Sequence, residues 1–242
     1  MEVSTRCIVL KVIKYNDNYN IVDFYTEALG RSSAMVSIPK SLKSKSKNNF
    51  YQPLFLLNAA LFRKSNNGLF KVKEINFDFP PKSIPYNPYK TAIAFFISEF
   101  IYHVVQEEEP NEALFSYLYN SILWLDSCDR DFANFHLMFL MRFSLFLGLY
   151  PNLSDYKEGD YFDMLNASFR STRPTDHVHF VSPDDASKIQ TLMRMNFDSM
   201  HLFKLNRKER VQILTLLSDY YKIHLPNLPE LKSLDILQDL FS

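Results

Sequence analysis

The chain has 242 residues, 47% of them apolar and 22% charged, and its 27 basic side chains balance 27 acidic ones. This is a globular composition with enough apolar surface for a substantial core. The two cysteines, Cys7 and Cys128, match no disulfide or metal spacing and fit a reducing, cytosolic setting. We expect no signal peptide at the start of the chain and no membrane-spanning helix, because no stretch approaches 18 uncharged apolar residues.

The first eighty residues contain five candidate strands rich in apolar and β-branched side chains. These strands occupy residues 6–15, 20–29, 28–38, 53–64 and 68–79. The last two are joined by Ser-Asn-Asn-Gly, a sequence typical of a tight hairpin turn. Five antiparallel strands with short turns predict a small closed barrel of the OB type, with an SH3-like barrel or a small open sheet as the alternative.

A proline-rich break follows the strands, and beyond it the apolar residues recur at helical spacing. Helices are expected at residues 89–108, 111–127, 131–151, 182–195, 206–225 and 231–241. Residues 152–183 lose this periodicity and predict a short β-hairpin. The fold class is therefore α+β, with a barrel domain at 1–80 and a helical domain at 81–242 that carries the hairpin as an insertion at 152–183.

Most catalytic chemistry is absent from the sequence. Only four glycines are present, and none are spaced to form a phosphate-cradling loop. His177 and His179 form an H-x-H pair, and Asp163 and Asp176 would complete a metal site with them, but no supporting ligand pattern accompanies the pair. We therefore expect surface histidines in a hairpin, no metal, no cofactor and no enzyme activity.

The charges are distributed unevenly along this neutral chain. Residues 1–80 contain 12 Lys or Arg against 6 Asp or Glu, whereas residues 81–242 contain 15 against 21. A basic barrel with lysines in a serine-rich loop and exposed aromatic rings is typical of single-stranded nucleic-acid binding. The predicted DNA-binding residues are Lys11, Lys14, Tyr15, Arg31, Lys40, Lys43, Lys45, Lys47, Arg63 and Lys64. The alternative is that the lysine-rich loop serves only to keep the protein soluble.

An ordered set of segments resembles the RecO family of DNA repair proteins. Residues 5–45 are similar to the start of that family, with matching positions that include Tyr15, Tyr25, Gly30 and Arg31. "YQPLFLLN" at 51–58, "FLMRFSLFLGLYP" at 139–151 and the ending "YYKIHLPNLPELKSLDIL" resemble later segments of the family in the same order. The resemblance thus extends over nearly the whole chain.

The resemblance implies a recombination mediator with an OB barrel and a helical domain. Such a protein binds single- and double-stranded DNA, anneals complementary strands, and with RecR helps load RecA onto DNA covered by single-stranded-DNA-binding protein. It also contacts the C-terminal tail of that protein, and it works in the cytoplasm near the nucleoid, away from membranes. Many relatives carry four zinc-binding cysteines where this chain has residues 152–183, so the resemblance implies no zinc here.

A site for the partner's acidic, apolar tail is expected around Arg142, which interrupts the most apolar helix. The predicted tail-binding residues are Phe139, Arg142, Leu145 and Phe146. The alternative is an arginine paired inside the protein or extended toward its surface. A different class of function also stays open: a helical protein-interaction adaptor whose barrel does not bind DNA.

Overall fold

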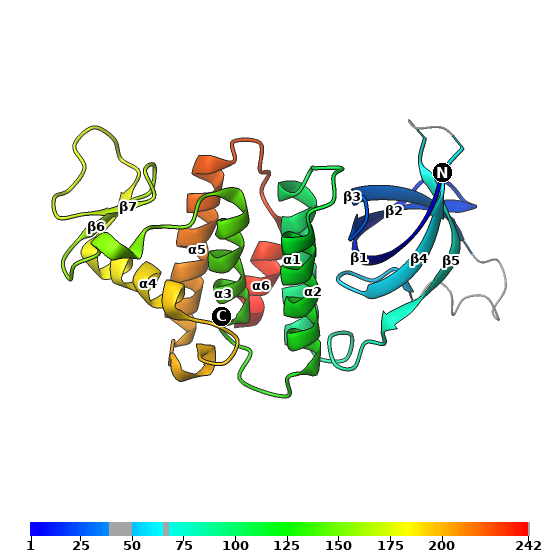
Figure 1. Cartoon of the computed structure of the whole chain (residues 1–242). Helices are drawn as coiled ribbons and strands as arrows, with labels where there is room; N and C mark the ends of the chain where they lie inside the picture. The colour runs from blue at the N-terminus through cyan, green and yellow to red at the C-terminus, as the bar shows by residue number, and fades with distance from the viewer. Residues whose placement is uncertain (39–49, 65–67, 242) are drawn as a thin grey trace. The chain divides into compact units, whose positions relative to one another are not determined.

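The computed structural model describes residues 1–38, 50–64 and 68–241. Its first part holds five strands: β1 (Glu2–Lys14), β2 (Tyr19–Thr26), β3 (Gly30–Ser37), β4 (Leu56–Phe62) and β5 (Phe70–Phe79). The six helices are α1 (Pro88–Val104), α2 (Glu112–Ser127), α3 (Phe135–Phe143), α4 (Pro183–Arg194), α5 (Arg207–His224) and α6 (Lys232–Phe241) (Figure 1). The α+β class predicted from the sequence is confirmed.

The five strands close into a barrel in the order β1-β2-β3-β5-β4, as an OB-type barrel does. Every neighbouring pair is antiparallel except β3 and β5, which run parallel through Ala34↔Phe70 and Met35↔Lys71. The expectation of purely antiparallel strands was wrong on this point. Strand directions alternate along this chain, and alternation cannot close around a ring of five, so one neighbouring pair has to be parallel.

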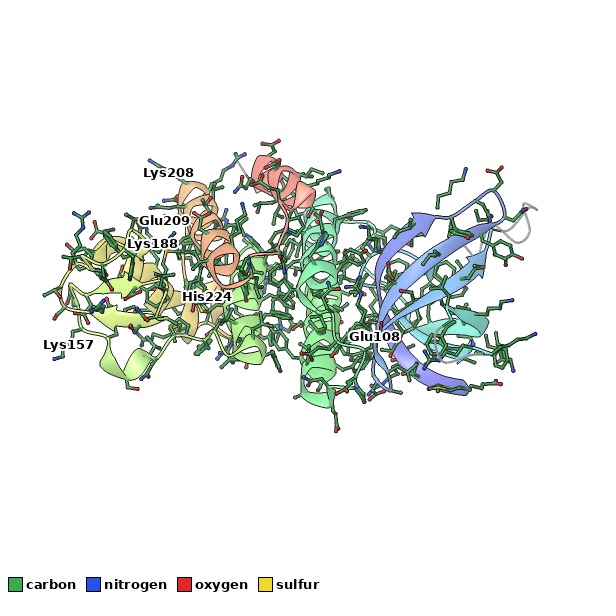
Figure 2. The ribbon with its side chains drawn as sticks, turned by 90° about the horizontal axis from the view of Figure 1, so that it is seen from above. Glu108, Lys157, Lys188, Lys208, Glu209 and His224 are labelled. Atoms are coloured by element: carbon green, nitrogen blue, oxygen red, sulfur yellow. The ribbon has the colours of Figure 1, made fainter. Side chains whose placement is uncertain are left out.

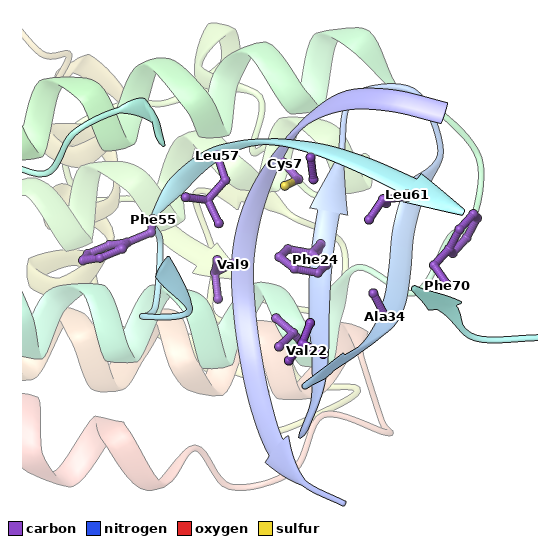
Figure 3. Close-up of a cluster of buried hydrophobic side chains, with 11 residues drawn as sticks. Cys7, Val9, Val22, Phe24, Ala34, Phe55, Leu57, Leu61 and Phe70 are labelled. Atoms are coloured by element: carbon purple, nitrogen blue, oxygen red, sulfur yellow. The ribbon is translucent and has the colours of Figure 1, made fainter. Parts of the chain in front are cut away.

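The barrel interior is filled by alternate residues of its strands, because successive side chains of a strand point to opposite faces. The inward set comprises Cys7, Val9, Val22, Phe24, Ala34, Val36, Phe55, Leu57, Ala59, Leu61 and Phe70 (Figure 3). The register of β1 against β2 shifts between Val9 and Lys11. Beyond this irregularity β1 becomes exposed, so its last four residues extend past the core as one arm of a hairpin.

The proline-rich break is anchored by a buried carboxylate at the end of α2. Asp126 accepts hydrogen bonds from the backbone amides of Lys82, Ser83 and Ile84 at 2.7 to 2.9 Å. Helix α1 then begins at Pro88, with Asn87 as its N-cap accepting from the amides of Tyr89 and Lys90. The break is therefore a fixed connection that sets where α1 starts.

The chain divides by contact into two compact units. One comprises residues 1–127 together with 231–240, so it holds the barrel, α1, α2 and most of α6; the other comprises residues 128–230. The predicted domains, 1–80 and 81–242, divide the chain by type of element instead and remain a prediction. Among the described residues, no helix is long and apolar enough to cross a membrane.

Residues 128–230 combine α3, α4 and α5 with a small sheet and three short 3-10 helices, η2 (Ser144–Leu147), η3 (Leu153–Asp155) and η4 (Met200–Leu202). The sheet contains β6 (Tyr161–Asp163), β7 (Ser168–Arg170) and β8 (Phe180–Val181) in the order β7-β6-β8. The predicted hairpin at 152–183 is present as β6 and β7, and the same segment adds β8 to the other edge of β6.

Candidate nucleic-acid interface

The hairpin between β1 and β2 presents cations and an aromatic ring at one end of the barrel. Lys14 pairs with Asn20 across the hairpin and extends its ammonium group to 3.2 Å from the Asp17 carboxylate. The Tyr15 side chain is 59% exposed, and Lys11 is also exposed. These three predicted residues are available to a ligand.

The four loop lysines, Lys40, Lys43, Lys45 and Lys47, lie outside the described residues. The described residues on both sides of them belong to the hairpin end of the barrel. On one side, the amide of Ile38 donates to the carbonyl of Asn18 at 2.8 Å. On the other, Phe50 contacts Phe77 of β5 with ring centroids 4.5 Å apart. Ile38, the last described residue before the four lysines, therefore lies at the same end as Lys14 and Tyr15.

Arg31 lies toward the other end of the strands, opposite Tyr25 in β2. Its guanidinium donates to the carbonyl oxygens of Tyr102 at 2.6 Å and Val105 at 3.1 Å. Those carbonyls belong to the last turn of α1 and its cap, where backbone acceptors lack helical partners. The Arg31 guanidinium is therefore engaged in hydrogen bonds within the protein, and the sequence did not indicate this role.

Arg63 and Lys64 follow β4 beside the first residues of β1, so they lie far along the barrel from the Tyr15 hairpin. The Arg63 guanidinium packs over the Phe70 ring at 4.6 Å, whereas Lys64 is exposed. The structure therefore does not bring the predicted DNA-binding residues into one patch. Lys11, Lys14 and Tyr15 share the hairpin end, and Arg63 and Lys64 lie at the opposite end.

A cluster around Tyr102 of α1 connects Lys11 with Arg31. The Lys11 ammonium lies 4.1 Å and the Arg31 guanidinium 4.3 Å from the centre of the Tyr102 ring. The neighbouring His103 ring is 4.9 Å away. Burial lowers the pKa of His103, and the charges of Lys11 and Arg31 lower it further while Glu99 opposes them. Sequence reasoning missed Tyr102 and His103, because nothing in a helical pattern shows which residues meet a strand.

The predicted tail-binding residues lie in residues 128–230 and differ strongly in exposure. Phe139 is 1% exposed and stacks between Phe135 and Phe143. Arg142 donates from Nε to the carbonyl of Met195 at 2.9 Å, as the alternative of an internally paired arginine anticipates. Leu145 is half exposed, and it is the member of this set with the most surface to offer a partner.

His177, one of the two histidines considered for a metal, lies in a polar cluster around Asp163. This carboxylate has no exposed side-chain surface and accepts from the amides of Leu165 and Asn166 at 3.1 Å. Arg170 donates to it at 3.1 Å, and His177 lies 3.3 Å from it. Burial opposes its charge, but these donors outweigh burial and the pKa of Asp163 lies below its usual value. Within the described ranges, no group of three or more His, Cys, Asp or Glu residues could hold a metal ion.

An OB-type barrel with exposed lysines and a tyrosine at one end, followed in the chain by a helical region, places the protein in a fold class that includes many nucleic-acid-binding modules. The family model for the N-terminal part of recombination protein O matches residues 1–77, and the model for its C-terminal part matches residues 85–235. The chain therefore belongs to the RecO family of DNA repair proteins.

Curated relatives are similar to this chain along nearly its whole length. A DNA repair protein RecO from Bacteroides fragilis is 53% identical over 234 residues, which is 97% of each chain. One from Phocaeicola vulgatus is 52% identical over 97% of each chain, and one from Flavobacterium psychrophilum is 34% identical over all of both chains. The family consists of non-enzymatic recombination mediators in DNA repair, and the predicted resemblance is confirmed.

Proposed function

We propose that this recombination mediator acts by binding DNA through the hairpin end of its barrel. Lys11, Lys14 and the lysine-rich segment neutralise phosphates, and Tyr15 stacks on a base. Both single and double strands present phosphates to such a surface. The observation that carries this proposal is that a 59%-exposed Tyr15 and two exposed lysines lie at the end of a RecO-family barrel to which Ile38, the last described residue before the four lysines, belongs.

Annealing follows from the same chemistry, because cations that screen two phosphate backbones let base pairing bring the strands together. Membership of the RecO family further supports RecR as a partner in loading RecA, and the acidic tail of single-stranded-DNA-binding protein as a second partner. In this proposal the tail meets the surface around Leu145 and Arg142. The work takes place in the cytoplasm, on nucleoid DNA.

The test is single-stranded oligonucleotide binding, followed by fluorescence anisotropy across a salt series. Each neutralised phosphate adds about −0.7 to the slope of log affinity against log salt, so the six lysines predict a slope of roughly −4.2. Replacing Lys40, Lys43, Lys45 and Lys47 with Ala leaves Lys11 and Lys14 and should reduce the slope to about −1.4. Lysines carry charge without the planar fork of arginine, so no sequence preference is expected.

A matched control removes four exposed cations from residues 128–230. It replaces Lys157, Lys204, Arg207 and Lys208 with Ala, and two of these positions are labelled in Figure 2. This variant should keep the wild-type slope. If the wild-type chain fails to bind DNA at low salt, the DNA role of the isolated chain is wrong, and the adaptor function takes its place.

A further inference from the structure

An apolar groove of about 840 Å³ lies beside the barrel within the unit of residues 1–127 and 231–240. One wall is the exposed end of β1 with the segment after the lysine-rich loop, and the other is formed by α1 and α6. Four aromatic residues line it: Tyr51, Tyr86, Phe95 and Tyr102. Tyr86 is 80% exposed and Phe95 is 52% exposed. Large rings left this open to solvent commonly mark a binding surface.

The available charge along this groove is positive. Lys11 and Lys232 line it, and Arg31 lies beside Tyr102 at its edge. Among the described residues that line it, the one acid is Glu99, whose carboxylate is engaged at the start of α6. Glu99 accepts from the amides of Lys232 at 3.2 Å and Ser233 at 2.9 Å, where a helix favours negative charge. The groove therefore offers an anionic ligand more positive than negative charge.

We propose that this groove holds the bases of a single nucleic-acid strand, with Phe95 and Tyr86 as stacking platforms and Lys11 and Lys232 on its phosphates. The inference rests on the DNA binding proposed above and extends it from the barrel onto α1 and α6. Lys11 belongs both to the hairpin end and to the groove, so the two surfaces are continuous. Tyr51, which follows the four lysines in the sequence, also lines the groove.

Flat rings flanked by cations favour a strand over other anionic partners. Proteins that bind single strands combine a positively charged track with aromatic rings on which bases stack. An acidic peptide with apolar side chains would use the same cations, but it needs apolar surface rather than flat rings. Substitutions of Phe95 therefore distinguish the two partners. Phe95→Leu keeps an apolar side chain but removes the ring on which a base stacks, and Phe95→Ala removes both.

The experiment measures the affinity of the full chain for a dT oligonucleotide, with and without a 2-aminopurine base that reports stacking. Phe95→Leu and Phe95→Ala should both weaken binding about tenfold, a loss within the range for one base–aromatic stack. Neither should change the salt slope, because no phosphate contact is removed. Both should also reduce the 2-aminopurine quenching seen with the unaltered chain.

Tyr89→Ala is the matched control. Tyr89 lies on the same helix and is 45% exposed, but it is not among the residues that line the groove. Its variant should bind like the unaltered chain. Unchanged DNA affinity in both Phe95 variants would overturn the groove proposal and leave DNA binding intact.

A labelled peptide rich in Asp and Phe distinguishes the other occupant. If Phe95→Ala abolishes peptide binding while Phe95→Leu keeps it and DNA affinity is unaffected, the groove is a peptide site and the proposal is wrong. If the unaltered chain binds no DNA at all, the proposed function fails first, and the groove proposal fails with it.

Discussion

Gly30 is the residue at which the β2–β3 turn meets the segment after α1. Its φ of +65° lies in the left-handed region, and an added Cβ would lie against the carbonyl oxygen of Glu109 and 2.8 Å from that of Glu107. The amide of the next residue, Arg31, donates to Glu107 at 2.9 Å, so the backbones are held together there. A side chain at this position therefore meets both strain and a clash.

Gly30→Ala should lower the free energy of unfolding by about 3 kcal/mol, combining left-handed strain with overpacking. Gly159→Ala provides the comparison, because Gly159 also has a positive φ, +93°, but open space around it. That change should cost only the strain, about 1 kcal/mol. Denaturant unfolding measures both, and equal losses would contradict the close approach at Gly30.

His136 makes stability depend on pH. Burial and the positive charge of Arg210 lower the pKa of His136 to about 3. In the unfolded chain a histidine titrates near pH 6.5. Below that pH the unfolded state therefore binds a proton at His136 that the folded state does not bind. Stability should therefore fall as pH drops from about 6.5, by up to about 1.4 kcal/mol per pH unit, and be fully present above it.

His136→Gln should flatten this dependence between pH 6.5 and 4.5, as measured by denaturant unfolding at each pH. His201→Gln, which changes an exposed histidine, should keep the wild-type dependence. The account of His136 is wrong if the two variants show the same slope.

At the scale of elements, a carboxylate of α1 caps the start of α6. Glu99 accepts from the hydroxyl and amide of Ser233 and from the amide of Lys232, so it caps a helix that is distant in sequence. Burial opposes the charge of this carboxylate, but the Ser233 hydrogen bonds prevail and the pKa of Glu99 is lowered. The cap and the packing of Leu237 together position the helix that forms one wall of the groove.

Glu99→Ala should therefore destabilise α6 by about 1 kcal/mol, the usual cost of losing an N-cap. Hydrogen exchange of the α6 amides should accelerate, while exchange in the barrel stays as it was. Glu230→Ala is the control, because its ion pair with Lys222 is exposed and contributes little. Equal protection of α6 in both variants would show that Glu99 does not hold the helix.

At the scale of the whole molecule, the small sheet within residues 128–230 is held by a buried polar cluster, and within the described ranges no group of three or more His, Cys, Asp or Glu residues could hold a metal ion. The three-stranded sheet depends on the Asp163 cluster, which brings together β6, the turn after it, β7 and the segment before β8. A buried carboxylate with several donors contributes substantially, and its loss leaves those donors without an acceptor.

Melting should consequently be unaffected by EDTA, whereas Asp163→Asn should cost about 2 kcal/mol at pH 7. Asp176→Asn changes a 67%-exposed carboxylate about 4 Å from Arg170 and His177, and it should have little effect. A drop in melting temperature on adding EDTA would show that a metal contributes to stability after all.

Much of the architecture could be predicted because element type is a local property. Alternation of apolar residues indicated the strands, and helical spacing indicated all six helices, each of which the structure contains. The segment 152–183 was predicted as two strands and a loop, but the structure has three short strands there, because runs of two or three residues are too few to show a period.

The candidate site was predicted less completely. The exposure of Lys11, Lys14 and Tyr15 agreed with expectation, but Arg31 also caps α1, and Phe139 lies in the core. Which face of a helix is buried depends on its neighbours in space. The sequence patterns of α1 and α3 could therefore not show that Phe139 is buried and Phe95 is exposed.

By itself, the sequence determined the elements, the OB-type barrel, the family and the basic character of the first eighty residues. Only the tertiary structure decided which of those charges are available and where aromatic rings gather beside them. The reason is the distance along the chain between partners: Arg31 and Tyr102 are 71 residues apart, and Glu99 and Ser233 are 134 apart. Local periodicity does not indicate such pairs. These contacts nevertheless form the groove and orient its charges.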